Sequence, residues 1–222
     1  MLARIERDTV GSRVYGSIRA DILMGRLRPG QKLTLDQMAR EYHSSVSTLR
    51  EVLNRLSSEK LVVAQGQRGF DVAPISIKDL RETAALRLLL ECHALEQSFA
   101  RGDMEWEGRV IAAHHNLFHL EKKMKAGIRS ETENWKRCDW QFHQTLISAC
   151  GSRTLMQSHA AIFDRYLRYQ MVALGDRGRV AVAEHKALLD CALSKDSKRA
   201  TEVLKKHISG GVEHALATGA IC

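Results

Sequence analysis

The chain has 222 residues and a formal net charge of +8 at pH 7, and this length allows one large domain or two modest ones. Hydrophobic residues make up 44 %, which is enough for a packed core, whereas 5 % aromatic residues and two prolines favour a helical protein. The positive charge suits a polyanionic partner, but half of the excess lies beyond residue 75. A nucleic-acid contact would therefore depend on individual arginines and not on a basic block.

Five cysteines are present, and none of them forms a Cys-x-x-Cys pair. An odd number without that spacing indicates free thiols in a reducing compartment and not a disulfide framework. The chain also has no signal peptide and no apolar run of about 18 residues, so the sequence supports neither secretion nor membrane spanning. We expect a cytoplasmic protein without a membrane partner.

Residues 1–73 follow the pattern of a winged helix-turn-helix DNA-binding domain. Predicted helices cover 13–26, 35–42 and 46–58, and predicted strands cover 61–64 and 69–73. Pro29 and Gly30 form a turn after the first helix, because proline fixes φ and glycine accepts a positive φ. Ser45 is a good N-cap for the third helix, whose apolar residues recur with helical spacing. The two strands then form a hairpin with a basic tip, the wing.

The third helix has an exposed polar face that fits the major groove of DNA. A recognition helix presents short polar groups and arginine to the bases while its other face packs. The candidate DNA contacts are Ser45, Ser47, Thr48, Arg50 and Asn54 on this helix, with Arg68 and Gly69 in the wing. The helix alone is equally compatible with an ordinary solvated surface, and the order of three helices and a wing favours DNA binding.

Residues 79–222 predict an antiparallel bundle of six helices, which a linker at 74–78 joins to the first domain. The predicted helices cover 76–102, 103–126, 130–151, 152–174, 179–194 and 197–217. Ser130 and Glu133 have the spacing of a capping box, and Asp196 or Ser197 would cap the last helix. No segment of this part alternates as a strand does, so the predicted fold class is mainly α.

One acid and three histidines of the second domain could meet in its core. Asp139 and His143 are four residues apart and share one face of a helix. His185 and His207 lie on two later helices. If the four side chains converge, they form a nitrogen and oxygen site suited to Zn²⁺, Ni²⁺ or another borderline divalent ion. The spacing alone more readily describes an ordinary helix-surface pair, so this observation leaves the metal site open.

The first domain resembles the DNA-binding domain of the GntR family of bacterial transcription regulators over residues 14–72. The segments that carry the resemblance are Ile22–Leu33, Leu49–Leu56 and Gln67–Val72. Two positions depart from the family pattern, because Val46 stands where an arginine is common and Thr48 where a proline is common. Valine cannot pair with a base as arginine does, so we expect Arg50, Thr48 and Arg68 to carry more of the readout.

The second domain resembles the FCD ligand-binding domain of the FadR subfamily. The matching segments are Asp139-x-x-x-His143, Glu184–Asp190, and Asp196 with Ala200 and His207. The resemblance implies that Asp139, His143, His185 and His207 hold a divalent metal ion, with a small carboxylate bound beside it. It also implies that Arg87, in the pattern Arg-x-x-Leu-Glu, contacts that carboxylate. The alternative is an internal pair between Arg87 and Glu91, four residues apart.

The resulting hypothesis is a metabolite-responsive repressor that binds a palindromic DNA operator as a homodimer. A small organic acid, docked on the metal ion, would change operator binding. We expect no catalytic residues. One alternative is a metal-dependent enzyme with an accessory DNA-binding module, which is disfavoured because no further acid or histidine has a matching position for a general base. The other alternative is a DNA-binding dimer without an effector.

Overall fold

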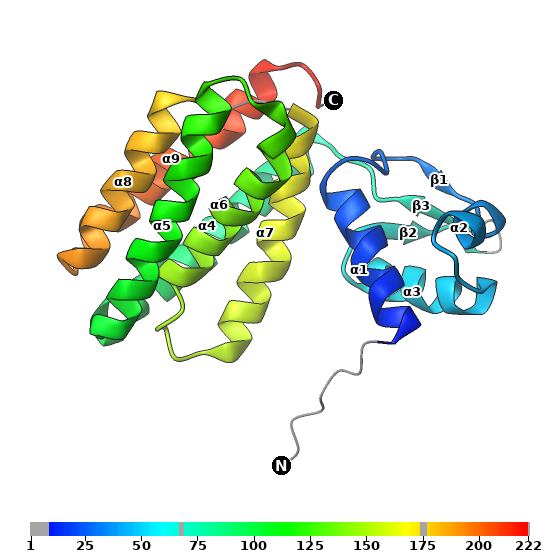
Figure 1. Ribbon diagram of the computed structural model, residues 1–222, viewed down its shortest axis with the longest axis horizontal. Helices are drawn as coiled ribbons and strands as arrows, with labels where there is room; N and C mark the ends of the chain where they lie inside the picture. Colours follow the sequence, from blue (N-terminus) through cyan, green and yellow to red (C-terminus); the bar gives the residue numbers. More distant parts are fainter. Residues whose placement is uncertain (1–8, 67–68, 174–176, 222) are drawn as a thin grey trace, which may run out of the picture. The chain divides into compact units, whose positions relative to one another are not determined.

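The structure is a computed structural model that describes residues 9–66, 69–173 and 177–221. It divides into two compact units, Met1–Ile75 and Ser76–Cys222. The division falls within the predicted linker at 74–78, and each unit is described by itself (Figure 1).

The first unit combines three helices with a small sheet. In chain order its elements are α1 (Val10–Leu23), β1 (Lys32–Leu33), α2 (Leu35–Glu41), α3 (Val46–Ser58), β2 (Val62–Ala64) and β3 (Phe70–Val72). β3 pairs antiparallel with both other strands, so the sheet order is β1-β3-β2, and β2 with β3 forms the wing. The buried side chains of α3 face α1, whose own apolar stripe includes Ile18.

Helix α3 forms over the residues that the sequence predicts, because an N-cap and an apolar stripe act within the helix itself. The hydroxyl of Ser45 accepts a hydrogen bond from the backbone N–H of Thr48 at 3.1 Å, which caps the first turn. Leu49, Leu53 and Leu56 recur with helical spacing and are fully buried. The opposite face of α3 is left to solvent.

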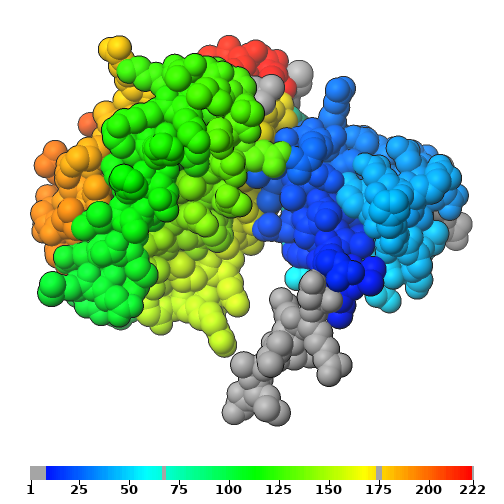
Figure 2. All heavy atoms as spheres, in the orientation of Figure 1, coloured from blue at the N-terminus to red at the C-terminus, as the bar shows by residue number. Residues whose placement is uncertain are grey.

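The second unit consists of six α-helices and one short 3₁₀ turn within the described ranges. The helices are α4 (Ile77–Arg101), α5 (Met104–Lys125), α6 (Thr132–Leu146), α7 (Arg153–Ala173), α8 (Arg179–Leu193) and α9 (Ser197–Ala217). α4 packs against α7 and α9, while α5 packs against α6 and α8 (Figure 1). Figure 2 shows α5 and the segment after it, in green, over much of the viewed face of this unit. The predicted fold class, a winged helix-turn-helix followed by a six-helix bundle, is confirmed.

No described helix is both long enough and apolar enough to cross a membrane. The predicted cap at Asp196 is present, because its side chain accepts a backbone N–H bond at the start of α9, and Ser76 caps the start of α4 in the same way. α4 begins at Ile77, inside the predicted linker.

The predicted start and end of the third bundle helix are wrong. Ser130 lies in a 3₁₀ turn (Arg129–Glu131), and Glu131 occupies the N-cap of α6 without a capping side-chain bond. The helix ends at Leu146 and not at Gly151. The Thr145 carbonyl accepts the indole N–H of Trp106 at 3.0 Å and the hydroxyl of Ser148 at 2.8 Å. In a continued helix, the N–H of Ala149 would donate to this carbonyl. It donates instead to Ser98 Oγ at 3.0 Å, so the helix does not continue.

Candidate functional site

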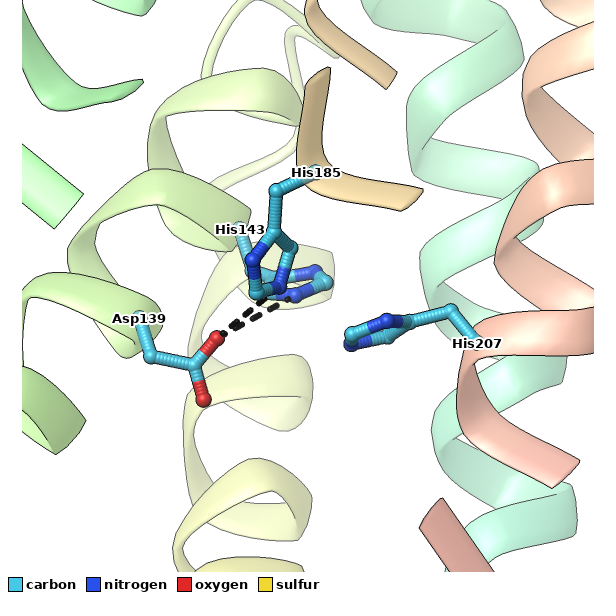
Figure 3. A group of neighbouring side chains, drawn as sticks. All are labelled: Asp139, His143, His185 and His207. Atoms are coloured by element: carbon cyan, nitrogen blue, oxygen red, sulfur yellow. Dashed lines mark ion pairs between the residues drawn. The ribbon is translucent and has the colours of Figure 1, made fainter. Parts of the chain in front are cut away.

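The four side chains that the sequence proposed as metal ligands meet in the core of the bundle. Asp139 and His143 come from α6, His185 from α8 and His207 from α9 (Figure 3). One ligand atom of each lies within 4.8 Å of the corresponding atoms of the others. All four residues are buried, with exposed fractions between 0 % and 7 %. Asp139 Oδ1 lies 3.3 Å from His185 Nε2 and 3.7 Å from His143 Nε2.

Each histidine of this cluster is held by a carboxylate at its other ring nitrogen. Nδ1 of His185 contacts Glu121 Oε1 at 2.6 Å, and Nδ1 of His207 contacts Glu184 Oε2 at 2.9 Å. Nδ1 of His143 contacts Glu91 in the same way. In a neutral imidazole, an N–H that donates from Nδ1 leaves the lone pair on Nε2, which is the atom that faces the other ligands. This carboxylate–histidine arrangement is typical of metal-ligating histidines.

The cluster also contains unsatisfied polar atoms. His143 Nε2 is buried and has no hydrogen-bond partner among the described residues, and the buried atoms His185 Nε2 and Asp139 Oδ1 face only each other, at 3.3 Å. A buried polar atom without a partner costs about 1–3 kcal/mol, so such atoms are rare unless they serve a ligand. Three imidazole nitrogens and one carboxylate oxygen at this spacing fit a divalent ion such as Zn²⁺ or Ni²⁺.

The ionisation of the cluster follows from burial and from the charges around it. Burial raises the pKa of Asp139, but the charge of Lys136 and the bond to His185 outweigh burial and hold the pKa well below its usual value. Burial lowers the pKa of His185, yet the bonds and charges of Asp139 and Glu121 raise it to about 9. Burial lowers the pKa of His207 to about 3, which the bond to Glu184 does not offset.

Arg87, the predicted contact of a carboxylate effector, lies next to the cluster but is engaged within the protein. Its Nε donates to Glu91 Oε2 at 2.9 Å, so the internal pair that the sequence left open is formed. Its guanidinium carbon lies 4.1 Å from the ring centre of Phe163 and 4.8 Å from that of Tyr166. Arg87 is only 1 % exposed, and its contact with an effector stays a prediction.

A pocket opens beside the cluster and encloses about 480 Å³ of empty space, part of it open to solvent. Three metal-ligand candidates line it, namely Asp139, His185 and His207. The cationic side chains on its wall are Lys136 and Arg177, and neither was predicted from the sequence. This pocket opens the cluster to solvent, and its interior space is about 40 Å³.

The predicted DNA contacts lie on the exposed side of the first unit. Ser45, Ser47, Arg50 and Asn54 are exposed and Thr48 is half-buried, so the polar face of α3 is available. Gly69, in the loop of the wing directly before β3, has φ of +104°, a conformation that favours glycine. Arg68 lies outside the described residues.

Two family models match the chain, "Bacterial regulatory proteins, gntR family" over residues 11–72 and "FCD domain" over residues 82–210. The chain belongs to the GntR family of transcription regulators with an FCD domain. The two matches coincide with the three-helix-and-wing unit and with the six-helix bundle. The family and the relatives of this regulator act in transcription and are not enzymes.

The regulator is similar over most of its length to two curated bacterial proteins. It is 39 % identical to the uncharacterized HTH-type transcriptional regulator BphR of Paraburkholderia xenovorans, over 89 % of this chain and 82 % of the relative. It is 31 % identical to the HTH-type transcriptional repressor GlaR of Escherichia coli, over 87 % and 90 %.

Solved structures share the fold. E. coli McbR/YncC superposes with a TM-score of 0.79 at 17 % identity, covering 95 % of this chain and 99 % of that one. A structure described as the metal-free FCD domain of TM0439 matches 66 % of this chain and 97 % of its own, with a TM-score of 0.52 at 25 % identity.

Sequence reasoning missed the residues that support the cluster. Glu91, Glu121 and Glu184 were not proposed as site residues, yet each contacts Nδ1 of one of the three histidines. Glu121 carries the clearest signal, because it falls on the apolar stripe of α5 between Leu120 and Met124. An acid on a buried stripe needs a partner.

Proposed function

We propose that the regulator is a repressor of the FadR subfamily, whose FCD domain binds a divalent metal ion and a small carboxylate that changes operator binding. The observation that carries this proposal is the buried cluster of one aspartate and three histidines, with each histidine oriented by its own carboxylate. Such a donor set favours Zn²⁺ or Ni²⁺ over Mg²⁺ or Ca²⁺, which prefer oxygen ligands. A relative at 31 % identity bears the name of a transcriptional repressor, which supports repression.

The DNA half of the proposal rests on the exposed face of α3. Arg50 and Asn54 are exposed and one helical turn apart, so both side chains reach the same groove. Val46 is 39 % exposed on the first turn and offers a base only apolar contact. Ser45 caps the helix, so we propose that its neighbours Ser47 and Thr48 take the phosphate contacts at the helix N-terminus.

We further propose that the regulator acts as a homodimer. One helix-turn-helix reads too few base pairs for useful specificity, and two copies read a palindrome. Leu86 and Leu89 of α4 lie on one helix face and are 44 % and 67 % exposed. Large leucines on the solvent face of a helix favour a protein partner, and a second copy of this chain is the partner that symmetry provides.

Coupling between the effector and the operator would follow from this arrangement. A bound metal ion would supply a Lewis-acidic anchor for a carboxylate oxygen. The four proposed ligands come from three helices, because Asp139 and His143 belong to α6 while His185 and His207 belong to α8 and α9. A ligand that contacts three helices at once favours one packing of the bundle over others. The resulting coupling free energy between effector binding and operator binding is typically about 1–3 kcal/mol.

The test is operator binding by fluorescence anisotropy, with the operator first found by selection from random duplexes. We expect the Zn²⁺-loaded protein to bind the operator, a small organic acid to weaken that binding, and a chelator to abolish the response to the acid. Arg50→Ala is the control for the DNA contact and should weaken binding with or without the acid. Operator affinity that is indifferent to metabolites and to chelation would leave a DNA-binding dimer without an effector.

A further inference from the structure

A buried lysine lies between the proposed metal ligands and the pocket that leads to them. Lys136 is only 5 % exposed, and its Nζ lies 3.6 Å from Asp139 Oδ2 and 3.1 Å from Gln170 Oε1. Its ammonium also lies 4.0 Å from the ring centre of Trp135. The other oxygen of Asp139 faces His185, so one carboxylate separates the ammonium group from the proposed metal position.

We infer that Lys136, and not Arg87, contacts the carboxylate of the effector, so that the acid binds beside Asp139 and contacts both the metal ion and this ammonium group. This inference rests on the proposed function, and it assigns the recognition of the acid to a residue on α6. It requires a lysine that faces the pocket, a charge balance that favours one added anion, and an Arg87 that is engaged elsewhere.

The position of Lys136 in the cavities meets the first requirement. Lys136, Trp135 and Gln170 line the pocket beside the cluster and also a second, more open pocket that encloses about 1350 Å³ including solvent. The second pocket extends along the start of α6 toward Arg129. Lys136 therefore lies on the wall that the open pocket shares with the pocket beside Asp139. Neither pocket has Arg87 in its wall.

The charges of the cluster meet the second requirement. Four carboxylates belong to the cluster or bind its histidines, namely Asp139, Glu91, Glu121 and Glu184. Three cations pair with these carboxylates, namely Arg87, Lys136 and Arg177. With neutral imidazoles this set has one excess negative charge, and a divalent ion converts it to one excess positive charge. One carboxylate then neutralises the site, since uncompensated buried charge is costly.

The third requirement concerns the two candidate cations. Arg87 donates to Glu91 at 2.9 Å and lies against the rings of Phe163 and Tyr166. To meet an acid in the pocket, Arg87 would have to leave a fully buried carboxylate unpaired. Lys136 pairs with Asp139, whose charge a metal ion would take over, so its contact with an acid leaves no buried charge behind.

The test compares wild type with Lys136→Met and Lys136→Gln at constant ionic strength. Calorimetric titration would measure the binding of Zn²⁺ alone and then of acetate, lactate, succinate and citrate to the Zn²⁺-loaded proteins. We expect both variants to bind Zn²⁺ and to lose at least ~10-fold in affinity for the acid that wild type binds best, as removal of a charge-assisted contact predicts. Lys198→Met removes one exposed lysine of α9 and should bind the acid as wild type does.

The outcomes separate the inference from the proposed function. A Lys136 variant that binds both Zn²⁺ and the acid as tightly as wild type would overturn the inference and leave the proposed function intact. Wild type that binds Zn²⁺ but none of the acids would overturn the proposed effector, and the inference with it. If one of the two variants does not fold, the other is interpreted in the same way.

Discussion

The pairing of each histidine with a carboxylate has a consequence for metal affinity. An imidazole ring can rotate about its Cβ–Cγ bond, and a bond at Nδ1 fixes both the ring and the tautomer. Glu91 belongs to α4 and Glu121 to α5, so two helices that carry no proposed ligand still orient the ligands, while Glu184 lies on α8 beside the ligand His185. The cluster is therefore prepared for a metal ion by more of the bundle than the four ligand positions indicate.

Replacement of Glu121 by Gln should weaken Zn²⁺ binding by about 10–100-fold, because loss of such a supporting carboxylate typically has this effect. Glutamine keeps the size of the side chain but removes the charge that His185 Nδ1 contacts at 2.6 Å. Competition with a chromophoric chelator would measure the dissociation constant. Glu105→Gln is the matched control, because Glu105 lies on the same helix, is exposed and pairs only with Arg109 in the described chain. Equal Zn²⁺ affinities in the two variants would contradict the role of Glu121.

Among the residues of the cluster, those with a recognisable spacing in the sequence could be predicted, and those without one could not. Asp139 and His143 share a helix face, and their spacing could be read directly. Lys136 and Glu121 meet the cluster only because α5, α6 and α8 pack together, and no local pattern encodes that meeting. Arg87 was assigned to an effector contact, and the structure shows that it also forms the internal pair with Glu91.

Pairs of elements are joined by tyrosine hydroxyl groups that donate to buried or half-buried carboxylates. Tyr15 of α1 donates to Glu59 at the end of α3 at 2.6 Å, and Tyr42 after α2 donates to Asp21 of α1 at 2.6 Å. In the bundle, Tyr169 of α7 donates to a carboxylate oxygen of Asp79, in the first turn of α4. Burial, followed by the bonded carboxylate, raises the pKa of all three phenols.

These bonds predict that the protein loses stability in base. The pKa of Tyr15 rises from 10.0 to about 12 on folding, so between these values the unfolded chain has released a proton that the folded chain keeps. The stabilisation is complete below pH 10 and is lost as pH rises toward 12, because the free energy of unfolding falls wherever the unfolded state binds fewer protons. Phenolate absorbance and circular dichroism followed together should change in one transition. Phenolate that appears near pH 10 while the helices persist would contradict this prediction.

Helix boundaries show the limit of prediction at the scale of elements. The start of α3 was predictable because Ser45 and three leucines act within one helix. The end of α6 was not, because the indole of Trp106 and the hydroxyl of Ser98 come from other helices and divert the backbone bonds after Leu146. After Leu146, tertiary contacts therefore outweigh the helix propensity of the local sequence.

For the whole molecule, the proposed function depends on a sensor and a reader that share one chain and on two copies of that chain. Within the bundle, α4 carries Glu91 toward the cluster on one face and Leu86 and Leu89 toward solvent on another. A shift of α4 on metal or acid binding would therefore reach the surface that the homodimer is proposed to use. Effector and dimer would be linked through this helix, which is the condition for coupling between distant sites.

Leu89→Lys should place a charge on this surface and weaken the homodimer, since Leu89 is 67 % exposed in one copy and would be buried between two. Sedimentation velocity should show a shift from dimer to monomer. Operator affinity should fall by at least ~10-fold, because each monomer then binds one half-site without the gain from the second. Met104→Lys is the matched control, because Met104 is 87 % exposed at the start of α5 and its replacement adds the same charge beyond the C-terminal end of α4. A Leu89→Lys protein that remains a dimer with wild-type operator affinity would place the contact between copies on another surface, and α4 would then have no part in coupling the acid to DNA.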